Sequence, residues 1–514
     1  MDKSQKEQVN NKQIAKNTLM LYIRMFFSMM VGFYTSRVTL ATLGVEDYGV
    51  YGIVGGIVGM MGFLNSAMGG ATSRFLIFES GKRDIERQKK TFSTALIVHA
   101  IIALVVFLIS ETFGLWYLNN RLVLPENRLP VANWVFQLSI ASTVLSITQV
   151  PYNASIIAHE RMDVYAYVEI FHVILKLVIV YMLTIVDIDK LLLYAFLMFF
   201  VAIIMITTYR IYCLKSFPEC HFTWIWDKNY IKPLISFSGW NLFGNFGGIM
   251  GNHGNNFVVN AFYGVTMNAA SSIAINVSGM VNQFASNAMA AFRPPIIKLY
   301  ATNDVKGMQE LTTMALAIIS FLYLLVAIPV FIKCDYLLGL WLVEVPQFSS
   351  LFCKIVLISI LFSTMRYIII INIHASGNVK LVSAFSGTAF CLSPIILYVL
   401  YKNGCPVQSS FVVLVFVNLF LLVVNIFIAK YYISIIKIRE YLFIIIRIIL
   451  CSSLSLFFAC FVDGYLRNGF ISLLIIGMIS TLFLTFTFYY GVLSSGQRRM
   501  ALNYVKTKVF KKLQ

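Results

Sequence analysis

Charged side chains inside long apolar segments are the residues of this chain with the clearest capacity for chemistry. Arg24 and Arg37 lie in one such segment, Lys176 in another and Arg366 in a third. A charge at the centre of a bilayer costs about 2.5–3.5 kcal/mol, and a water-filled cavity removes most of that cost. Because arginine and lysine pair with phosphate oxygens, we expect all four residues to bind an anionic substrate. The alternative is a structural pair with a neighbouring helix or, for Arg37, snorkelling to the interface.

A second candidate group consists of Glu169, His172 and Lys176, which follow one another at steps of three and four residues. These steps place all three side chains on one face of a helix. Histidine changes its charge near neutral pH, so we expect Glu169 or His172 to couple transport to an ion by taking up a proton. The alternative is a self-neutralising Glu–Lys stripe that packs against another helix.

Amide side chains recur at Asn241, Asn245, Asn252 and Asn256, at steps of four and seven residues. On a regular helix they form one polar stripe. Amides both donate and accept hydrogen bonds, as sugar hydroxyls require, and they also join membrane helices at about 0.6 kcal/mol per bond. We expect the stripe to line a cavity and bind substrate.

No pattern in the sequence indicates catalysis, a metal or a cofactor. The eight cysteines are scattered, without a Cys-x-x-Cys pair or a Cys/His cluster. A Walker A motif is absent, so ATP is not expected to be the direct energy source. We therefore expect no catalytic residue, no metal site and no cofactor.

The apolar segments must be membrane spans, because the chain has too little charge to cover a water-soluble surface. Of the 514 residues, 59% are hydrophobic and 12% charged, with a mean hydropathy of +0.80. About 20 apolar residues cross the hydrocarbon core as a helix. We expect an all-α polytopic membrane protein with about 14 transmembrane helices. The predicted spans are 17–41, 48–70, 91–113, 130–153, 164–186, 190–212, 232–262, 266–290, 311–332, 351–372, 380–401, 407–429, 441–461 and 468–492.

The formal net charge of +18 is explained by membrane orientation better than by nucleic-acid binding. With the N-terminus inside, the basic link 79–90 and the basic tail 498–512 both fall on the inner side, as the positive-inside rule requires. The first apolar run is too long for a cleavable signal peptide. We expect both termini in the cytoplasm, membrane lipid as a partner and no bound nucleic acid.

A shift of about 220 residues aligns the first two spans with the seventh and eighth, so that Gly44 meets Gly264. An offset of six spans preserves orientation, so the halves are predicted to be parallel repeats related by an axis along the membrane normal. Two such bundles facing each other enclose a central cavity. The predicted parts are a cytoplasmic N-terminal segment (1–16), an N-terminal six-helix bundle (17–212), a cytoplasmic linker (213–231), a C-terminal six-helix bundle (232–429), helices 13 and 14 (430–492) and a basic cytoplasmic tail (493–514).

The stretch LGVEDYGVYGIV at residues 43–54 resembles the opening of bacterial polysaccharide-biosynthesis flippases. These are the O-antigen and capsule members of the multidrug/oligosaccharidyl-lipid/polysaccharide (MOP) exporter superfamily. The resemblance implies a V-shaped arrangement of the two bundles. It also implies translocation of an undecaprenyl-diphosphate-linked oligosaccharide across the bacterial inner membrane, as a repeat unit of O-antigen in lipopolysaccharide, capsule or exopolysaccharide. A lipid-linked glycan is then the expected substrate, with a glycan polymerase and a chain-length regulator as further partners.

Three functions are weighed on these grounds. The first is a lipid-linked glycan flippase that works by alternating access. The second is a cation-coupled multidrug exporter of the same superfamily, which usually has a buried acid in its first bundle; the first span here carries two arginines instead, although Glu169 keeps this function open. The third is a membrane glycan polymerase or ligase, which needs a sizeable outer loop that none of the predicted links provides.

Overall fold

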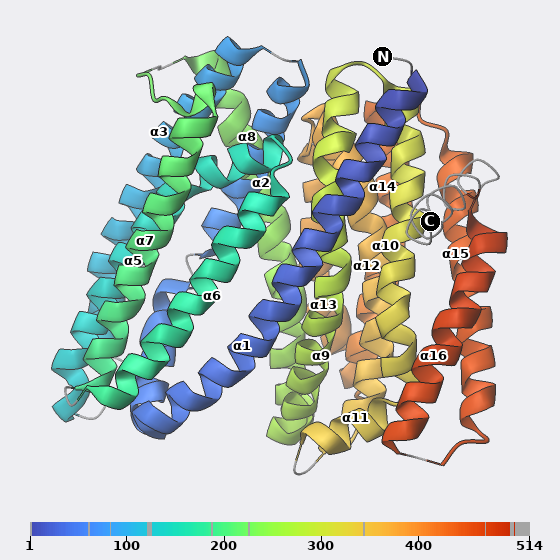
Figure 1. The fold of residues 1–514 in the computed structure, drawn as a ribbon. Helices are drawn as coiled ribbons and strands as arrows, with labels where there is room; N and C mark the ends of the chain where they lie inside the picture. The colour runs from blue at the N-terminus through green and yellow to red at the C-terminus, as the bar shows by residue number, and fades with distance from the viewer. Residues whose placement is uncertain are drawn as a thin grey trace, which may run out of the picture. The chain divides into compact units, whose positions relative to one another are not determined.

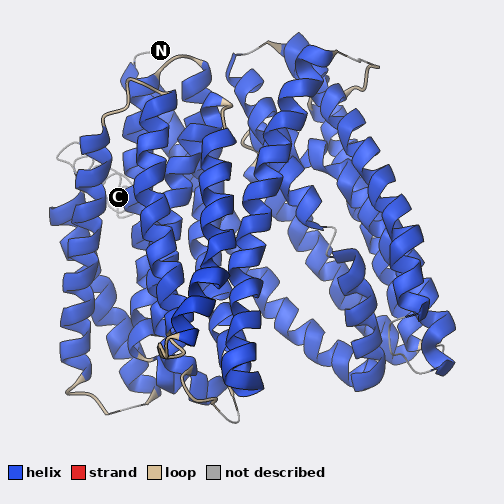
Figure 2. Cartoon of the chain, turned by 180° about the vertical axis from the view of Figure 1, so that it is seen from behind, coloured by secondary structure: helices blue, strands red, loops and turns tan. Residues whose placement is uncertain are grey.

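The computed structural model of this chain is built from α-helices (Figure 1). The described residues are 3–59, 62–82, 84–120, 126–186, 189–224, 227–342, 345–467, 469–493 and 498, and within them there is no strand (Figure 2). The predicted all-α fold class is confirmed.

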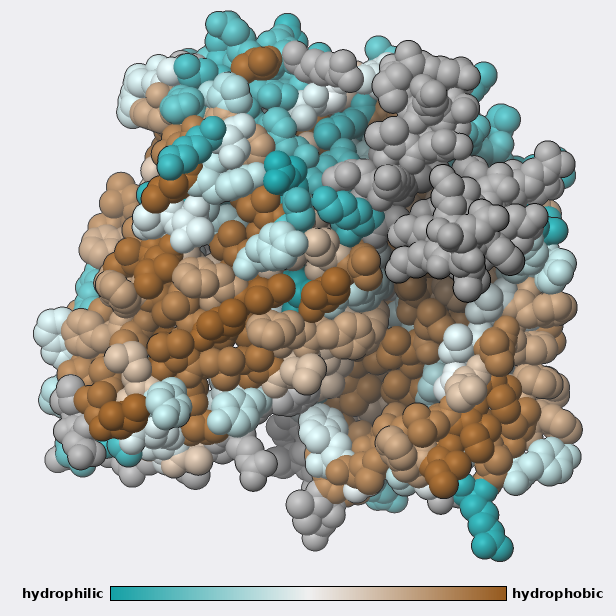
Figure 3. Space-filling model, in the orientation of Figure 1, coloured by the Kyte–Doolittle hydropathy of each residue, from teal (hydrophilic) through white to brown (hydrophobic). Residues whose placement is uncertain are grey.

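Ten helices of the described residues are long and apolar enough to cross a membrane. They are α3 (Ile85–Ile109) with η1 (Ser110–Gly114) and α4 (Leu115–Asn120), α5 (Leu129–Ala158), α6 (Met162–Ile185), α7 (Lys190–Ser216), α10 (Val305–Ile332), α12 (Ser349–Ser376), α13 (Lys380–Lys402), α14 (Ser409–Tyr432), α15 (Ile438–Asp463), and α16 (Phe470–Thr487) with η5 (Phe488–Val492). The other four predicted spans fall on α1 (Lys3–Gly59), α2 (Gly62–Lys82), α8 (Lys228–Ile249), η4 (Met250–Gly254) and α9 (Asn255–Ala301). Short elements complete the chain: η2 (Glu126–Arg128), η3 (Pro218–Cys220) and α11 (Cys334–Trp341). On the face drawn in Figure 3, hydrophobic side chains cover the middle of the helices and hydrophilic ones gather mostly toward their upper ends, as in a protein that spans a bilayer.

The internal repeat is visible in two equivalent helix kinks. Gly44 interrupts α1 with φ 79° and ψ 168°, and Gly264 interrupts α9 with φ 78° and ψ −173°. This backbone conformation is open essentially only to glycine. The two kinks occupy matched positions under the shift that aligns the two halves, so the break between the first two predicted spans of each repeat falls at the same point.

The helix starts repeat as well. Asp84 caps α3 by accepting a hydrogen bond from the backbone N–H of Arg87, and Asp304 caps α10 by accepting one from Gly307. An aspartate at this position satisfies one of the free N–H groups at a helix start. The predicted pair of parallel repeats is therefore present in the structure, and α15 and α16 follow the second repeat.

The contacts within the chain divide it into two compact units. The first unit contains Met1–Phe246 and Arg293–Asn303, and the second contains Gly247–Phe292 and Asp304–Gln514. Helices α8 and α9 each contribute to both units, so this division by contact differs from a division by sequence repeat. The predicted bundle boundaries stay predictions.

Buried polar contacts hold α15 on the second unit. Thr312 donates to the side chain of Asn372 (2.9 Å), and Asn372 donates to the hydroxyl of Tyr441 (2.7 Å). At the other end of α15, Asp463 forms an ion pair with Lys333, which is 2% exposed. Polar contacts inside a membrane protein add to van der Waals packing, the main force between its helices. The first helix outside the repeat is therefore fastened at both of its ends.

Within the first unit, α2 and the end of α9 touch at equivalent positions of the two repeats. A Cβ atom built at Gly81 would lie 2.9 Å from the Cβ of Ala301 and 3.0 Å from the Cα of Lys298. Gly81 and Ala301 are matched by the repeat shift of about 220 residues. Lys298 adds an ion pair with Glu160 at 2.8 Å. Glycine at position 81 permits this close crossing.

We expect Gly81→Leu to destabilise the protein, because the new side chain would meet backbone and Cβ atoms that cannot move aside freely. Overpacking of this kind costs about 1–3 kcal/mol. The midpoint of thermal unfolding of the detergent-purified protein should fall. Gly477→Leu in α16 is the matched control, because nothing lies within 4 Å of a Cβ there. Equal midpoints for the two variants would contradict the close crossing.

Candidate functional site

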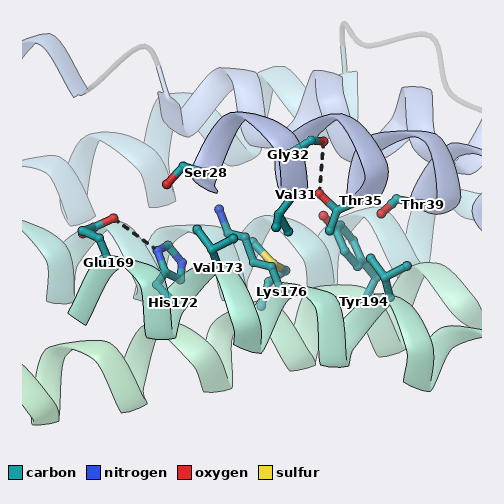
Figure 4. A pocket seen from close by; sticks show the side chains of 12 residues that line it. Ser28, Val31, Gly32, Thr35, Thr39, Glu169, His172, Val173, Lys176 and Tyr194 are labelled. Carbon is teal, nitrogen blue, oxygen red and sulfur yellow. Dashed lines mark hydrogen bonds and ion pairs between the residues drawn. The ribbon is translucent and has the colours of Figure 1, made fainter. Parts of the chain in front are cut away.

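A polar pocket of about 410 Å³ lies between α1 and α6 in the first unit, with α7 closing one side (Figure 4). Its volume falls within the range of small-molecule sites. The lining side chains are Ser28, Val31, Gly32, Thr35, Thr39, Glu169, His172, Val173, Lys176, Val180, Tyr194 and Met198. The structure thus gathers all three residues of the predicted α6 group at one cavity.

Two helical faces of different chemistry meet across this pocket. On α1, Ser28, Gly32, Thr35 and Thr39 follow at steps of four, three and four residues, which is the spacing of one helix face. This face carries hydroxyls and one glycine, and the Thr35 hydroxyl donates to the carbonyl of Gly32 at 3.1 Å. The opposing face of α6 carries the ionisable groups (Figure 4). A small, hydroxyl-bearing face opposite a charged face leaves room for a polar ligand.

The carboxylate of Glu169 is compensated by its protein neighbours. Tyr209 of α7 donates its hydroxyl to Glu169 Oε1 at 3.2 Å, and His172 Nδ1 lies 3.8 Å from Glu169 Oε2. Arg24 adds a positive charge that acts on Glu169. An acid with these partners is held in place on the α6 face.

Arg24 lies one helical turn before Ser28 and contacts α6. Its guanidinium stands 5.1 Å from the ring centroid of Tyr165 and hydrogen-bonds the Tyr165 side chain. Stacking of a guanidinium over an aromatic face is favourable. Arg24 therefore has the protein partners that a structural role requires, and it stands beyond the Glu169 end of the pocket.

Lys176 differs from its neighbours, because it forms no hydrogen bond or ion pair with the described residues. It lies inside the candidate span Met162–Ile185 and lines the pocket, with its side chain extending toward α1 (Figure 4). An unpaired ammonium within a span is costly unless water or an anion reaches it. The pocket supplies that access.

Arg366, the fourth predicted cation, is placed elsewhere. It lies on α12 in the second unit, 3% exposed, with Nη1 at 3.3 Å from the hydroxyl of Ser386. Its guanidinium stacks on the rings of Tyr367 and Phe390, at 4.7 and 5.3 Å from their centroids. A substrate could reach Arg366 only after α12 and α13 rearrange.

The predicted amide stripe does not run along one regular helix. Asn241 and Asn245 lie on α8, and Asn256 lies on α9, with the π-helical segment η4 between them. A π-helix holds an extra residue per turn, so it rotates the following residues out of the expected register. The half-buried Asn241 faces Gly70 of α2, and Asn245 is exposed. The side chains of Arg37 and Asn252 lie outside the described part of the chain.

Several residues that line the pocket or contact its lining are not found by sequence reasoning. Tyr194 and Tyr209 carry no signal, because only tertiary packing brings α7 beside α6. The steps from Ser28 to Thr39 offer a weak signal, since hydroxyls and glycine recur there with helical periodicity.

An intramembrane pocket lined by a lysine that has no partner among the described residues, in an all-α protein built of two parallel repeats, is typical of a membrane transporter. The family described as "Polysaccharide biosynthesis protein" matches residues 40–345, more than half of the chain. This protein belongs to that polysaccharide biosynthesis family, which confirms the resemblance seen at residues 43–54. No curated protein sequence matches the chain.

Solved structures of transporters share the fold. A MATE transporter in the bent conformation aligns with a TM-score of 0.69 at 12% identity, over 83% of this chain and 97% of that one. A MOP superfamily transporter from Pyrococcus furiosus, described as having a binding pocket of reverse polarity that suggests a different function, aligns with a TM-score of 0.67 at 13% identity, over 82% and 96%. The Vibrio cholerae MATE transporter VcmN in the bent form aligns with a TM-score of 0.65 at 15% identity, over 84% and 99%. At these identities the likeness establishes the fold.

We expect Lys176→Cys to react readily with a water-soluble, membrane-impermeant thiol reagent, because the pocket admits water to this position. Leu183→Cys is the control on the same helix, since Leu183 is fully buried. Labelling is measured by mass spectrometry above the background of the native cysteines. Equal labelling of the two positions would show that the pocket is not accessible to water.

Proposed function

We propose that this protein is a flippase that carries undecaprenyl-diphosphate-linked oligosaccharide from the cytoplasmic to the periplasmic leaflet of the bacterial inner membrane. The substrate is a repeat unit of O-antigen, capsule or exopolysaccharide, and both termini are cytoplasmic. Membership of the polysaccharide biosynthesis family and a fold shared with transporters support this proposal. The observation that carries it is Lys176, which lines the α1–α6 pocket and has no partner in the described part of the chain.

The charge balance of the pocket favours an anionic ligand. Glu169 is already compensated by Tyr209, His172 and Arg24, whereas Lys176 has no partner among the described residues. A diphosphate would pair with the Lys176 ammonium, and the hydroxyl of Ser28 could donate to a further phosphate or sugar oxygen. The Thr35 hydroxyl, which donates to Gly32, could accept a hydrogen bond from a sugar hydroxyl. The pocket is much smaller than a whole repeat unit, so it would hold the diphosphate and the adjoining sugar while the polyprenyl chain stays in lipid.

The charge balance of the pocket favours the flippase over a multidrug exporter. A cationic drug would have to be attracted by Glu169, but that carboxylate already has positive and hydrogen-bonding partners. The free charge of the pocket would repel such a drug. Pocket polarity is also the feature from which a different function was suggested for the Pyrococcus furiosus transporter.

Alternating access would move the head group without making or breaking a bond. The diphosphate binds while the site is open to the cytoplasm, and the site then opens outward and releases it. Net transport in one direction needs an energy source. Moving one charge through the membrane potential supplies about 2.3 kcal/mol per 100 mV. We place the coupling proton on the Glu169–His172 pair, which adjoins Lys176 on the same face of α6.

We expect Lys176→Gln to reduce flipping by about tenfold or more, the loss that follows from removing a charge-assisted hydrogen bond. Lys176→Arg should keep most of the activity, because it keeps the charge. Lys402→Gln, at the exposed end of α13, is the control. The measurement is polymer production in a flippase-deficient strain at matched membrane levels of each variant. Full complementation by Lys176→Gln would refute the anionic-head-group site.

We expect Glu169→Gln and His172→Ala to lose the response of flipping to a proton gradient. The glutamine keeps an oxygen that accepts the Tyr209 hydrogen bond but cannot take up a proton. The assay uses proteoliposomes with an imposed pH difference and a fluorescent lipid-linked oligosaccharide. If both variants respond to the gradient as the wild-type protein does, this pair is not the coupling site.

A further inference from the structure

The repeat provides a second copy of the helix pair that forms the pocket. In the first unit the pair is α1 with α6, and in the second unit the α8–η4 segment packs against α13. Helix α6 starts at Met162 and α13 at Lys380. Aligning these two starts matches Glu169, His172 and Lys176 with Gly387, Phe390 and Pro394.

The second copy is closed by direct contact. A Cβ atom built at Gly247 would lie 2.5 Å from the Cα of Gly387. One built at Gly251 would lie 2.7 Å from the ring of Phe390, and one at Gly254 would lie 3.2 Å from the ring of Pro394. Each position on α13 that corresponds to an ionisable residue of α6 is thus uncharged and in contact with a glycine. No ligand fits between helices whose backbones meet.

The first copy of the helix pair is open beside Gly32. Gly32 lines the pocket, and a Cβ atom built there would meet nothing within 4 Å. The glycines of the second unit therefore permit close packing, whereas Gly32 borders empty space. In a helix interior glycine costs about 1 kcal/mol relative to alanine, and at Gly32 no close contact accounts for that cost.

We infer that Gly32 is a specificity-determining residue, which keeps the α1–α6 pocket wide enough for the sugar that adjoins the diphosphate at Lys176. This inference rests on the proposed function. The α8–α13 copy is a packing contact and leaves no room for a head group between its helices. A side chain at position 32 narrows the pocket from the α1 side and leaves Lys176 in place.

The experiment compares two probes, undecaprenyl diphosphate and its N-acetylglucosaminyl derivative, bound to the full-length protein in lipid nanodiscs. Gly32→Leu should weaken binding of the glycosylated probe by about tenfold relative to the bare diphosphate, the scale on which a filled pocket discriminates between ligands. Its thermal stability should stay at the wild-type level. Gly477→Leu should change neither quantity, because nothing lies within 4 Å of its Cβ position on α16.

The Gly247→Ala variant tests whether the α8–α13 pair serves packing alone. Its Cβ would meet the backbone of Gly387, so it should lower thermal stability and leave the ratio of the two affinities unchanged. The inference is overturned if Gly32→Leu keeps the wild-type ratio, or if it lowers stability as Gly247→Ala does. Binding by the Lys176→Gln variant distinguishes failure of the proposed function from failure of the inference about Gly32. If it binds bare diphosphate as the wild type does, the proposed function itself fails; if it loses that binding while Gly32→Leu keeps the ratio, only the inference about Gly32 fails.

Discussion

A positive charge without a protein partner has to stay in contact with water, even inside a transmembrane helix, and this constraint shapes the first unit. Lys176 lies within the span formed by α6 and has no described partner. Closing α1 onto α6 with apolar side chains would bury the ammonium at a cost of several kcal/mol. The α1 face instead carries Ser28, Gly32 and Thr35, which leave a polar space. The pocket thus gives this ammonium access to water.

Glu169, the acidic group of the site, has protein partners, and this distinguishes it from Lys176. Three different helices contribute to the neighbourhood of Glu169: Arg24 from α1, His172 from α6 and Tyr209 from α7. A carboxylate left without such partners would pair with the lysine and neutralise it. On one face of α6, Glu169 has its own partners and Lys176 has none among the described residues. The pocket is therefore positive in character although its described lining contains no cluster of cations.

Duplication of a helix pair explains both the likeness and the difference of the two units. The kinks at Gly44 and Gly264 and the caps at Asp84 and Asp304 show that the backbone plan was kept. The facing surfaces diverged, because charges opposite small polar residues hold a pocket open, whereas glycines opposite an uncharged face allow the backbones to meet. The α1–α6 pair encloses a pocket, and the α8–α13 pair is a packing contact.

The sequence by itself determined the features that are local or periodic. Apolar stretches of span length predict the helices, the shift of about 220 residues predicts the repeat, and steps of three and four residues place Glu169, His172 and Lys176 on one face. It could not show which helix lies opposite that face, because most faces of a membrane helix are apolar and carry no signal for a partner. It also could not foresee the π-helical segment that breaks the amide stripe. Only the tertiary structure decided that Arg366 is enclosed by rings while Lys176 lines a pocket without a partner among the residues described, since the cost of a charge depends on what packs around it.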